Sequence, residues 1–374
     1  MSGIKAGLPP TVGQAVFALR GLGGRSTARA PPSAPPPTKS LAQLWIDFLR
    51  PYFDGAGTLS GRIPYTATLP SNEVIIPSEI AGVTVIALGN TGYNGLFRDL
   101  PITSVSIPDT IGLLGYSVFQ ACPALEAITI PSSVTSLGNS CFRGSALEAI
   151  TIPSSVTSLG SSCFRECPLE TVIIFGGATP LVLNPYCFLN CDNLVTITIP
   201  GRTTSLPSRC LAYCSNLETV RIENGPTSLG DACFHYCGKL ATVTLPSSVT
   251  SLYDECFRSC IGLTRIIIPS SVELMGNPAL TPHGEKGGLC FYDCTVLTAV
   301  HFLSSTPPTT LGTKTFALES TGLPPPALIL YVGTTAADAT TFYNALVALS
   351  GGPATFGFPI ESAKYVDGSL FPPP

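Results

Sequence analysis

Six short stretches of the sequence place two cysteines four positions apart. A pair of thiolates can supply half of a metal site, and thiols of neighbouring copies can form disulfides. A free cysteine is also a small apolar side chain that packs well in a core. The spacing is that of one helical turn, which predicts that both sulfurs of a pair share a face. The six stretches are CFREC (163–167), CFLNC (187–191), CLAYC (210–214), CFHYC (233–237), CFRSC (256–260) and CFYDC (290–294).

The pairs recur because the chain is built from repeats. LEAITIPSSVTSLGNSCFRGSA (125–146) is followed at near identity by LEAITIPSSVTSLGSSCFRECP (147–168), and units of 23 residues follow at 194–216, 217–239 and 240–262. The pattern L-x-x-I-x-I-P-x-x-V-T-S-L-G-x-x-C-F-x-x-C joins an alternating strand, a second short extended piece and a turn. One unit cannot bury its apolar side alone, so the pattern predicts a solenoid of stacked coils.

The repeat resembles the BspA-like leucine-rich repeat, whose pattern is I-P-x-x-V-T-x-I-G-x-x-A-F-x-x-C-x-x-L-x-x-I. IPSEIAGVTVIALG (76–89) is similar to the opening repeat of that family, and LILYVGTTAADATTFYNAL (328–346) is similar to its closing unit, a strand and a short helix. The resemblance covers residues 72–347 and implies a leucine-rich-repeat solenoid. For bacterial relatives it implies a surface or secreted adhesin. In seven coils the small buried Ala of the family is replaced here by Cys.

That replacement favours core packing for the cysteines, because the replaced residue is itself small and buried. Cys141 is paired with Ser145 and Cys122 with Val118, so a pair can lose one member. A structural zinc site needs four ligands and could not tolerate such losses, and three histidines are too few to complete six sites. His235, inside one pair, is expected at an exposed turn position. Disulfides between stacked coils stay open, because they depend on an oxidising compartment.

The segment before the repeats has two parts. SLAQLWIDFLRPYF (40–53) predicts an amphipathic helix that is capped by Ser40 and limited by Pro51. We expect it to cap the first coil, with a partner-binding or membrane-surface helix as the alternative. Residues 1–39 are basic, proline-rich and free of acidic residues, which is typical of an organellar transit peptide. A tail, an arm that orders on a partner, and a secretory signal are the alternatives. The apolar face of the helix consists of Leu41, Leu44, Trp45, Phe48, Leu49 and Tyr52.

Composition and motifs argue against several functions. Charged residues make up 11% of the chain, yet no uncharged apolar stretch reaches the roughly 18 residues of a membrane span. After residue 46 the chain carries 14 basic and 23 acidic residues, which makes it a poor nucleic-acid binder. No phosphate-binding loop, nucleophile elbow or metalloprotease helix occurs, so we expect no enzyme activity, cofactor or small-molecule substrate. An enzyme would require a cleft with a carboxyl or thiol of strongly shifted pKa.

The outward position of the I-x-I strand supplies the candidate partner-binding residues. Down the stack this position reads Thr129, Thr151, Ile173, Thr198, Arg221, Thr244, Ile267 and His301. Ile173, Arg221, Ile267 and His301 interrupt the threonines, and scattered apolar and arginine residues are typical of protein-binding surfaces. Two irregular coils add Tyr186 and, in an 11-residue insertion, His283, Glu285 and Lys286. For these loops neutral variation is an equal alternative. Glu126, Glu148, Glu170 and Glu218 share one repeat position and form an acidic column.

The sequence therefore predicts a single leucine-rich-repeat solenoid of about nine to ten β-rich coils with short helical turns. We divide the chain into a tail (1–39), a cap helix and lead-in (40–71), the solenoid (72–303) and a C-terminal cap and tail (304–374). The expected function is that of a non-catalytic scaffold or accessory subunit that binds a protein partner in a larger, possibly organellar complex. A eukaryotic, mitochondrial location is favoured over a cytoplasmic one and over secretion. The alternative is a surface or secreted adhesin.

Overall fold

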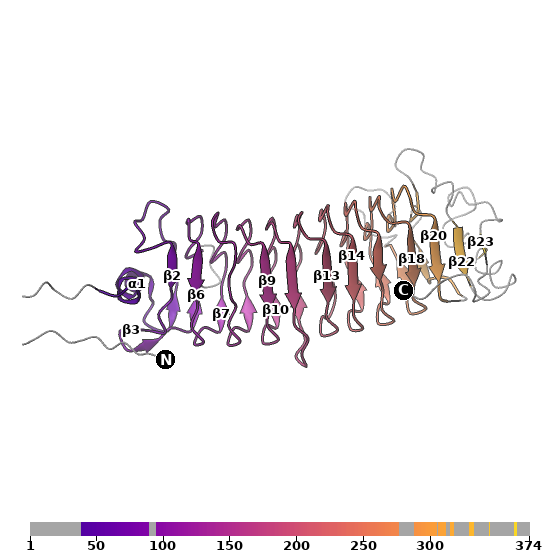
Figure 1. Cartoon of the computed structure of the whole chain (residues 1–374). Helices are drawn as coiled ribbons and strands as arrows, with labels where there is room; N and C mark the ends of the chain where they lie inside the picture. Colours follow the sequence, from indigo (N-terminus) through magenta and orange to yellow (C-terminus); the bar gives the residue numbers. More distant parts are fainter. Residues whose placement is uncertain are drawn as a thin grey trace, which may run out of the picture. The chain divides into compact units, whose positions relative to one another are not determined.

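The computed structural model describes residues 39–89, 95–276, 288–304, 306–311, 315–317, 329–332, 344 and 363–364. All of them belong to one compact unit, Lys39–Pro374. Within it, successive coils lie side by side, and each repeat position forms a column that runs from coil to coil (Figure 1). This is the predicted leucine-rich-repeat solenoid, with many parallel strands and few helices.

The first column, which we call the long-strand column, contains the L-x-x-I-x-I segments. Its strands pair in parallel with one residue opposite the same residue of the next coil, as in Thr171↔Ala149 and Thr196↔Thr219. Burial alternates along each strand, so every second side chain enters the core. The strands are β2 (Glu73–Ile75), β6 (Ser104–Ser106), β9 (Ala149–Ile152), β11 (Thr171–Ile174), β13 (Thr196–Ile199), β14 (Thr219–Ile222), β16 (Thr242–Thr244), β18 (Arg265–Ile268), β20 (Ala299–Phe302), β22 (Ile329–Val332) and β23 (Ala363–Lys364).

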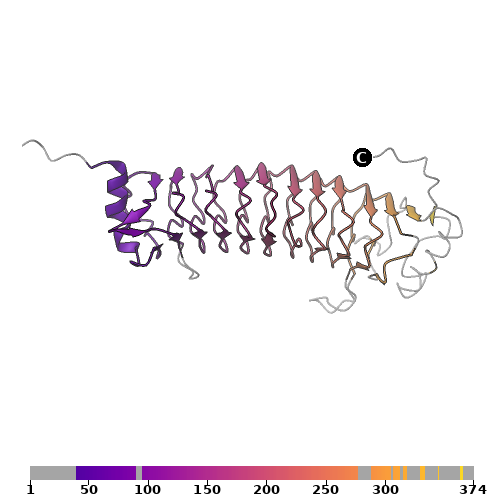
Figure 2. The same ribbon diagram turned by 90° about the horizontal axis from the view of Figure 1, so that it is seen from below.

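The second column, the short-strand column, contains the V-T-S-L pieces and lies on the other side of the core (Figure 2). Each strand places its second residue in the core, as Leu159 does in β10. The strands are β1 (Thr58–Leu59), β5 (Ala87–Leu88), β7 (Leu113–Leu114), β8 (Ser136–Leu137), β10 (Ser158–Leu159), β12 (Val182–Leu183), β15 (Ser228–Leu229), β17 (Ser251–Leu252), β19 (Leu274–Met275) and β21 (Thr310–Leu311). An antiparallel pair, β3 (Glu79–Ile80) and β4 (Val83–Thr84), forms the longer turn of the opening repeat.

The third column, the turn column, contains the C-F-x-x-C segments. The sequence predicts a helical turn here, and the structure shows tight turns instead. The residue before the cysteine position is left-handed in every described case except Leu289 before Cys290, for example Ser162 at φ 57° and Glu166 at φ 64°. This conformation directs N–H groups at the next coil, so that Phe164 donates to Cys187 O at 2.8 Å and Glu166 donates to Leu189 O at 2.8 Å. The hydrogen bonds between coils outweigh the cost of about 1 kcal/mol per left-handed residue.

The core is built from columns of identical side chains. Phenylalanine rings of successive coils stack almost in parallel, first Phe97, Phe119, Phe142, Phe164 and Phe188 at 5.4 to 5.6 Å, then Phe234, Phe257, Phe291 and Phe316 at 5.1 to 5.5 Å. Leu211 occupies the ring position between the two groups and is fully buried. Rings at this separation attract each other beyond the burial of their area.

The predicted cap helix is α1 (Leu41–Leu49), followed by the 3₁₀ turn η1 (Arg50–Tyr52). Ser40 caps it by accepting a hydrogen bond from Gln43 N at 3.2 Å, as the sequence predicts. Trp45 is fully buried, donates to Glu73 O at 2.8 Å and contacts the ring of Phe97, the first ring of the stack. The helix thus closes the first coil. One residue of the predicted apolar face, Leu44, does not enter the core and is 40% exposed.

Both ends extend past the predicted limits of the solenoid. Strand β1 lies in the segment assigned to the lead-in and pairs with β5 of the solenoid. Strand β22 lies in the predicted closing unit and pairs with β20 of the solenoid. Most of the remaining closing unit, including its expected helix, lies outside the described residues. The domain limits given above therefore stay a prediction. Within the described ranges, no helix combines the length and the apolar character that crossing a membrane requires.

Candidate functional site

The long-strand column brings four of the predicted residues to one surface position. Ile173 on β11 and Ile267 on β18 are 45% and 43% exposed. Arg221 on β14 is exposed and lies opposite Thr198 and Thr244. His301 on β20 is half-buried and lies opposite Ile267. The repeat register thus places all four side chains in one column, while their role in binding stays a proposal.

The other predicted residues do not join this surface. Tyr186 belongs to the turn after β12, where it is half-buried with φ 65° and donates its N–H to Ser208 O at 3.1 Å. It lies in the turn column rather than the long-strand column. His283, Glu285 and Lys286 lie outside the described residues.

The cysteines are core residues, as the family pattern implies. All fourteen are buried free thiols. Burial raises the pKa of each of them, to about 12 for Cys122 and Cys214 and to about 11 for Cys167. A thiol so protonated at neutral pH is a poor nucleophile and a poor metal ligand. Among the described residues, no group of three or more potential ligands could hold a metal ion.

The two cysteines of a pair nevertheless differ, which the sequence analysis missed. The second thiol of each pair donates to the carbonyl of the ring-position residue in the preceding coil, as Cys191 Sγ does to Phe164 O and Cys237 Sγ to Leu211 O. The seven such distances are 3.0 to 3.3 Å. Among the described residues, the first thiols donate no hydrogen bond. Ser145 takes the place of a second cysteine, and it fits there because its hydroxyl also donates to a ring-position carbonyl, Phe142 O, at 2.7 Å.

The regular pairing of the long strands fails between β6 and β9, between β16 and β18 and, next to Ile173, between β11 and β13. The sheet that contains β9 ends at β11, and the next sheet begins at β13. A groove of about 320 Å³ lies there, which we call the seam. The predicted residue Ile173 is part of it. The seam is lined by Glu170, Thr171, Val172, Ile173, Ile174, Thr196, Ile197 and Thr198.

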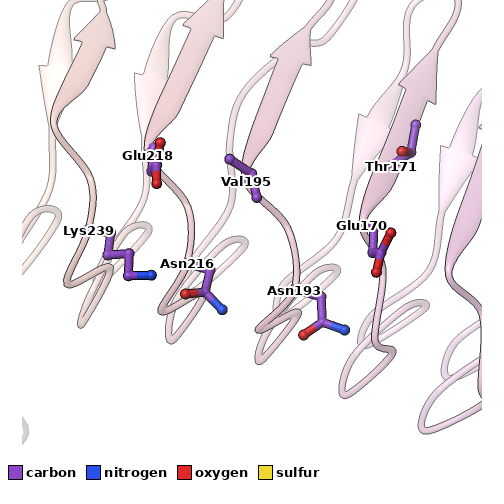
Figure 3. A pocket seen from close by; sticks show the side chains of 7 residues that line it. All are labelled: Glu170, Thr171, Asn193, Val195, Asn216, Glu218 and Lys239. Atoms are coloured by element: carbon purple, nitrogen blue, oxygen red, sulfur yellow. The ribbon is translucent and has the colours of Figure 1, made fainter.

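One end of the seam opens into a second hollow of about 490 Å³, which we call the acidic pocket. Glu170 and Glu218 of the acidic column lie on either side of Val195, which takes the place of a glutamate in that column (Figure 3). Asn216 Nδ2 donates to Asp192 O at 2.7 Å and holds the neighbouring coil. Two carboxylates and Lys239 line a pocket that is open and shallow, so it favours binding over acid–base chemistry.

Arg202 closes the opposite end of the seam, and the sequence analysis did not single it out. It is 9% exposed, and its guanidinium donates to Val156 O at 2.7 Å, Phe175 O at 2.8 Å and Pro153 O at 3.3 Å. In regular coils the same position is a serine, such as Ser155, that donates to the preceding coil. Burial lowers the pKa of Arg202, and the carbonyls satisfy its charge. In the sequence, Arg202 is marked only by being an arginine at a position where the regular coils have serine.

The expectation for His235 was wrong. His235 is only 6% exposed and packs against the rings of Tyr213 and Tyr236, with centroids at 5.5 and 4.4 Å. Neither ring nitrogen has a hydrogen-bond partner. Burial, together with the charges of Arg258 and Arg209, lowers the pKa of His235 to about 4. Tyr236 of the same coil and Tyr213 of the preceding coil place large rings against this position, and the sequence of one repeat does not reveal the second of them.

The stacked parallel strands and the repeated core positions define a leucine-rich-repeat protein. The profile of the BspA-type leucine-rich-repeat region matches residues 93–182 and 179–281 in six copies. These matches span just over half of the chain, which therefore belongs to the BspA-type leucine-rich-repeat family. No curated protein sequence matches the chain.

Several solved structures share the fold. A leucine-rich-repeat protein from Bacteroides ovatus is 21% identical, with coverage of 75% of this chain and 87% of that one and a TM-score of 0.27. A leucine-rich cell surface protein from Faecalibacterium prausnitzii is 18% identical, with coverage of 78% and 93% and a TM-score of 0.32. The pneumococcal vaccine antigen PcpA is 15% identical, with coverage of 83% and 86% and a TM-score of 0.37.

Proposed function

We propose that the chain is a non-catalytic scaffold or accessory subunit that holds a protein partner on its long-strand column. The observation that carries this proposal is the set of exposed side chains that interrupt the threonines at one register position, above all Ile173, Arg221 and Ile267. Exposed apolar residues with a neighbouring arginine are what protein interfaces use as anchors. Leucine-rich repeats of this family are generally non-catalytic.

The chemistry of the described groups agrees with a binding role. The thiols are protonated and buried, and the acidic column is exposed. Burial raises the pKa of one carboxyl, Asp231, but this residue lies in the turn column, where its Oδ1 accepts a hydrogen bond from Asp254 N at 3.2 Å.

The cellular compartment of the protein is a separate and more specific part of the proposal. A larger organellar complex is supported only by the basic, acid-free character of residues 1–39. The alternative is a surface or secreted adhesin, the role that the BspA-like repeat implies for bacterial relatives. Buried free thiols are compatible with a reducing compartment and favour the scaffold.

Purification of the native protein with mass spectrometry of its companions tests the proposal. We expect partners in fixed stoichiometry, and we expect Arg221→Glu or Ile267→Lys to release them. The matched control is Arg209→Glu, the same charge reversal at an exposed arginine of the turn column. A protein that is isolated alone, or that keeps its partners in both strand variants, contradicts the scaffold. The mass of its N-terminal peptide then shows whether the basic segment is removed.

A further inference from the structure

One coil departs from the repeat at three consecutive positions, and all three line the same hollow. Regular coils read P-S-S-V, as at 153–156, whereas this coil reads P-G-R-T at 200–203. Gly201, Arg202 and Thr203 line a hollow of about 420 Å³, which we call the Arg202 pocket. The departures from the repeat are thus concentrated at one place. The other lining residues are Gly177, Ala178, Pro180, Thr204 and Gly225.

Arg202 brings a positive charge to this pocket. Its guanidinium has five N–H groups, and four of them donate to carbonyls, namely the three given above and Thr179 O at 3.5 Å. One N–H of Nη2 is left over. Arg202 forms no ion pair with a described residue, and the carbonyls around it are neutral groups. The pocket therefore keeps a net positive charge and one guanidinium donor.

Thr203 places a hydroxyl where the regular coils have a buried valine, such as Val156 or Val249. Thr203 is 1% exposed, and its Oγ1 has no hydrogen-bond partner among the described residues. A buried hydroxyl without a partner destabilises a fold, so packing alone would favour valine here. An unsatisfied buried group next to a hollow indicates a ligand that satisfies it.

Two backbone N–H groups of the lining add to these donors. The N–H groups of Gly177 and Ala178 donate to no described residue, and both residues are exposed. A Cβ on Gly177 would lie 3.7 Å from Cδ of Arg202, so this backbone passes close to the arginine side chain. Successive backbone N–H groups beside a positive charge are typical of anion sites.

One carboxylate of the chain already binds to the lining. Glu223 Oε2 accepts a hydrogen bond from Gly201 N at 3.0 Å. None of the described lining residues is itself acidic. Because the charge of Glu223 opposes a second anion nearby, its removal is expected to strengthen the binding of an anion in the pocket.

We propose that the Arg202 pocket binds a phosphate group, either free or as a monoester. Because carbonyls hold its other donors, the guanidinium offers one N–H and not the two-pronged fork that favours a planar carboxylate. Single donors from Arg202, from Thr203 and from the backbone of Gly177 and Ala178 suit the oxygens of a tetrahedral anion. The volume is in the range of small-ligand sites. This inference goes beyond the proposed function and does not depend on it.

Equilibrium dialysis of ³²P-labelled inorganic phosphate against the full chain tests the proposal, at an ionic strength held constant with sodium chloride. We expect saturable binding of one phosphate per chain. Sulfate is expected to compete, whereas acetate is expected to compete at least about tenfold more weakly. The absence of saturable binding would overturn the proposal. Equal competition by acetate would overturn the assignment to a tetrahedral anion.

Two variants locate the site without changing Arg202, whose hydrogen bonds also join neighbouring coils. Thr203→Val restores the valine of the regular coils and removes the hydroxyl. Ala178→Phe adds a ring at an exposed position of the lining. Each is expected to weaken phosphate binding about tenfold. If both variants bind phosphate as the unmodified chain does, the pocket is not the site.

Matched controls make the same changes outside the lining. They are Thr250→Val and Ala241→Phe, both at exposed positions of later coils, and they are expected to bind phosphate within about twofold of the unmodified chain. Thermal unfolding checks that all variants are folded. Thr203→Val is expected to be at least as stable as the unmodified chain, because the lost hydroxyl has no partner. A loss of binding without a loss of stability therefore separates ligand binding from a purely structural role.

Glu223→Gln is expected to act in the opposite direction and to tighten phosphate binding about threefold, because it removes a negative charge and keeps an acceptor for Gly201 N. Weaker binding in this variant would contradict the proposed place of the anion. Competition by N-acetyl-O-phosphoserine amide distinguishes the two sources of the phosphate group. If this monoester binds more tightly than inorganic phosphate, the ligand is an ester, and if it binds more weakly, the ligand is the free anion.

Discussion

The coils before and after the seam use the same chemistry and form two separate stacks. Five phenylalanine rings, from Phe97 to Phe188, stack on the N-terminal side, and four, from Phe234 to Phe316, stack on the C-terminal side. Leu211 stands between them. Both columns of strands are interrupted in this region, and the long-strand column is also interrupted between β6 and β9 and between β16 and β18. β11 and β13 are unpaired, and β12 is linked toward β15 only through the isolated bridges Leu181↔Thr203 and Leu206↔Leu229.

This difference teaches that repetition gives each coil the same partners and that an irregular coil loses part of them. In a regular stack each backbone group finds the same partner one coil away, so no edge remains. At the seam the irregular stretch 175–181 keeps backbone hydrogen bonds to neighbouring coils at Phe175 and Leu181, and the guanidinium of Arg202 supplies further hydrogen bonds to carbonyls of this region. The unpaired edges and the apolar floor at Ile173 arise in the same place.

The turn columns of the two stacks differ as well. On the N-terminal side Glu166 pairs with Arg143 at 3.2 Å and with Arg165 at 2.9 Å. On the C-terminal side the rings of Tyr213 and Tyr236 stack at 5.1 Å, and Arg258 lies over the ring of Tyr292 at 5.2 Å. Exposed ion pairs contribute little and are screened by salt, whereas ring contacts are not. The turn column of the C-terminal stack thus adds ring contacts to an ion pair, Arg258 with Glu255 at 2.6 Å, whereas the N-terminal one carries the ion pairs of Glu166.

The largest effect is expected from the ring stack. Phe164→Ala removes a fully buried ring stacked on both sides at 5.4 Å, and we expect the free energy of unfolding to fall by about 4 kcal/mol. Leu211→Ala makes the corresponding truncation at the ring position that holds no ring. It should lower the free energy of unfolding by about 1 kcal/mol less than Phe164→Ala does. Urea unfolding followed by circular dichroism measures both. Equal losses would mean that ring stacking adds nothing to the burial of area.

Arg202→Ala tests the link between the two stacks. It leaves the carbonyls of Val156, Phe175 and Pro153 without their donor, and we expect a loss of about 3 kcal/mol. Because the link is broken, the two stacks should then unfold in separate transitions. Arg143→Ala, which removes an exposed ion pair, serves as the control and should cost less than about 1 kcal/mol. A single unchanged transition in Arg202→Ala would contradict the role of this residue.

His235 gives the C-terminal stack a pH dependence. Its pKa is lowered to about 4 in the fold, below the ordinary value of 6.5, so the unfolded chain binds more protons between these two pH values. Stability is therefore expected to fall, on the order of 2 kcal/mol, as the pH drops from 6.5 toward 4. His235→Phe should raise stability and remove this part of the slope, whereas Tyr236→Phe should retain it. Denaturation midpoints from pH 4 to 8 measure the slope, and an unchanged slope in His235→Phe would refute the assignment.

The smallest effect separates the two cysteines of one pair. Cys187→Ser buries a hydroxyl without an acceptor and should cost about 2 kcal/mol. Cys191→Ser keeps an acceptor, Phe164 O, and should cost less than about 1 kcal/mol. Thermal unfolding of the two variants compares them directly. If the two variants lose the same free energy of unfolding, the second cysteine of the pair has no hydrogen-bonding role and the thiols serve packing alone.

The sequence by itself determined the features that recur in every coil. The period, the strands, the buried cysteines, the cap at Ser40 and Trp45 and the outward column all follow from a pattern in which each residue has the same neighbours in every coil. The leucine-rich-repeat family follows from the same pattern.

Only the tertiary structure decided where the repetition stops. The burial of His235 depends on tyrosines from two coils, and the acceptors of Arg202 come from residues 153, 156 and 175. The unpaired edges of β11 and β13 depend on how one irregular coil lies against the next. These contacts join residues far apart in the sequence at positions that break the repeat, so a pattern that averages over repeats cannot encode them.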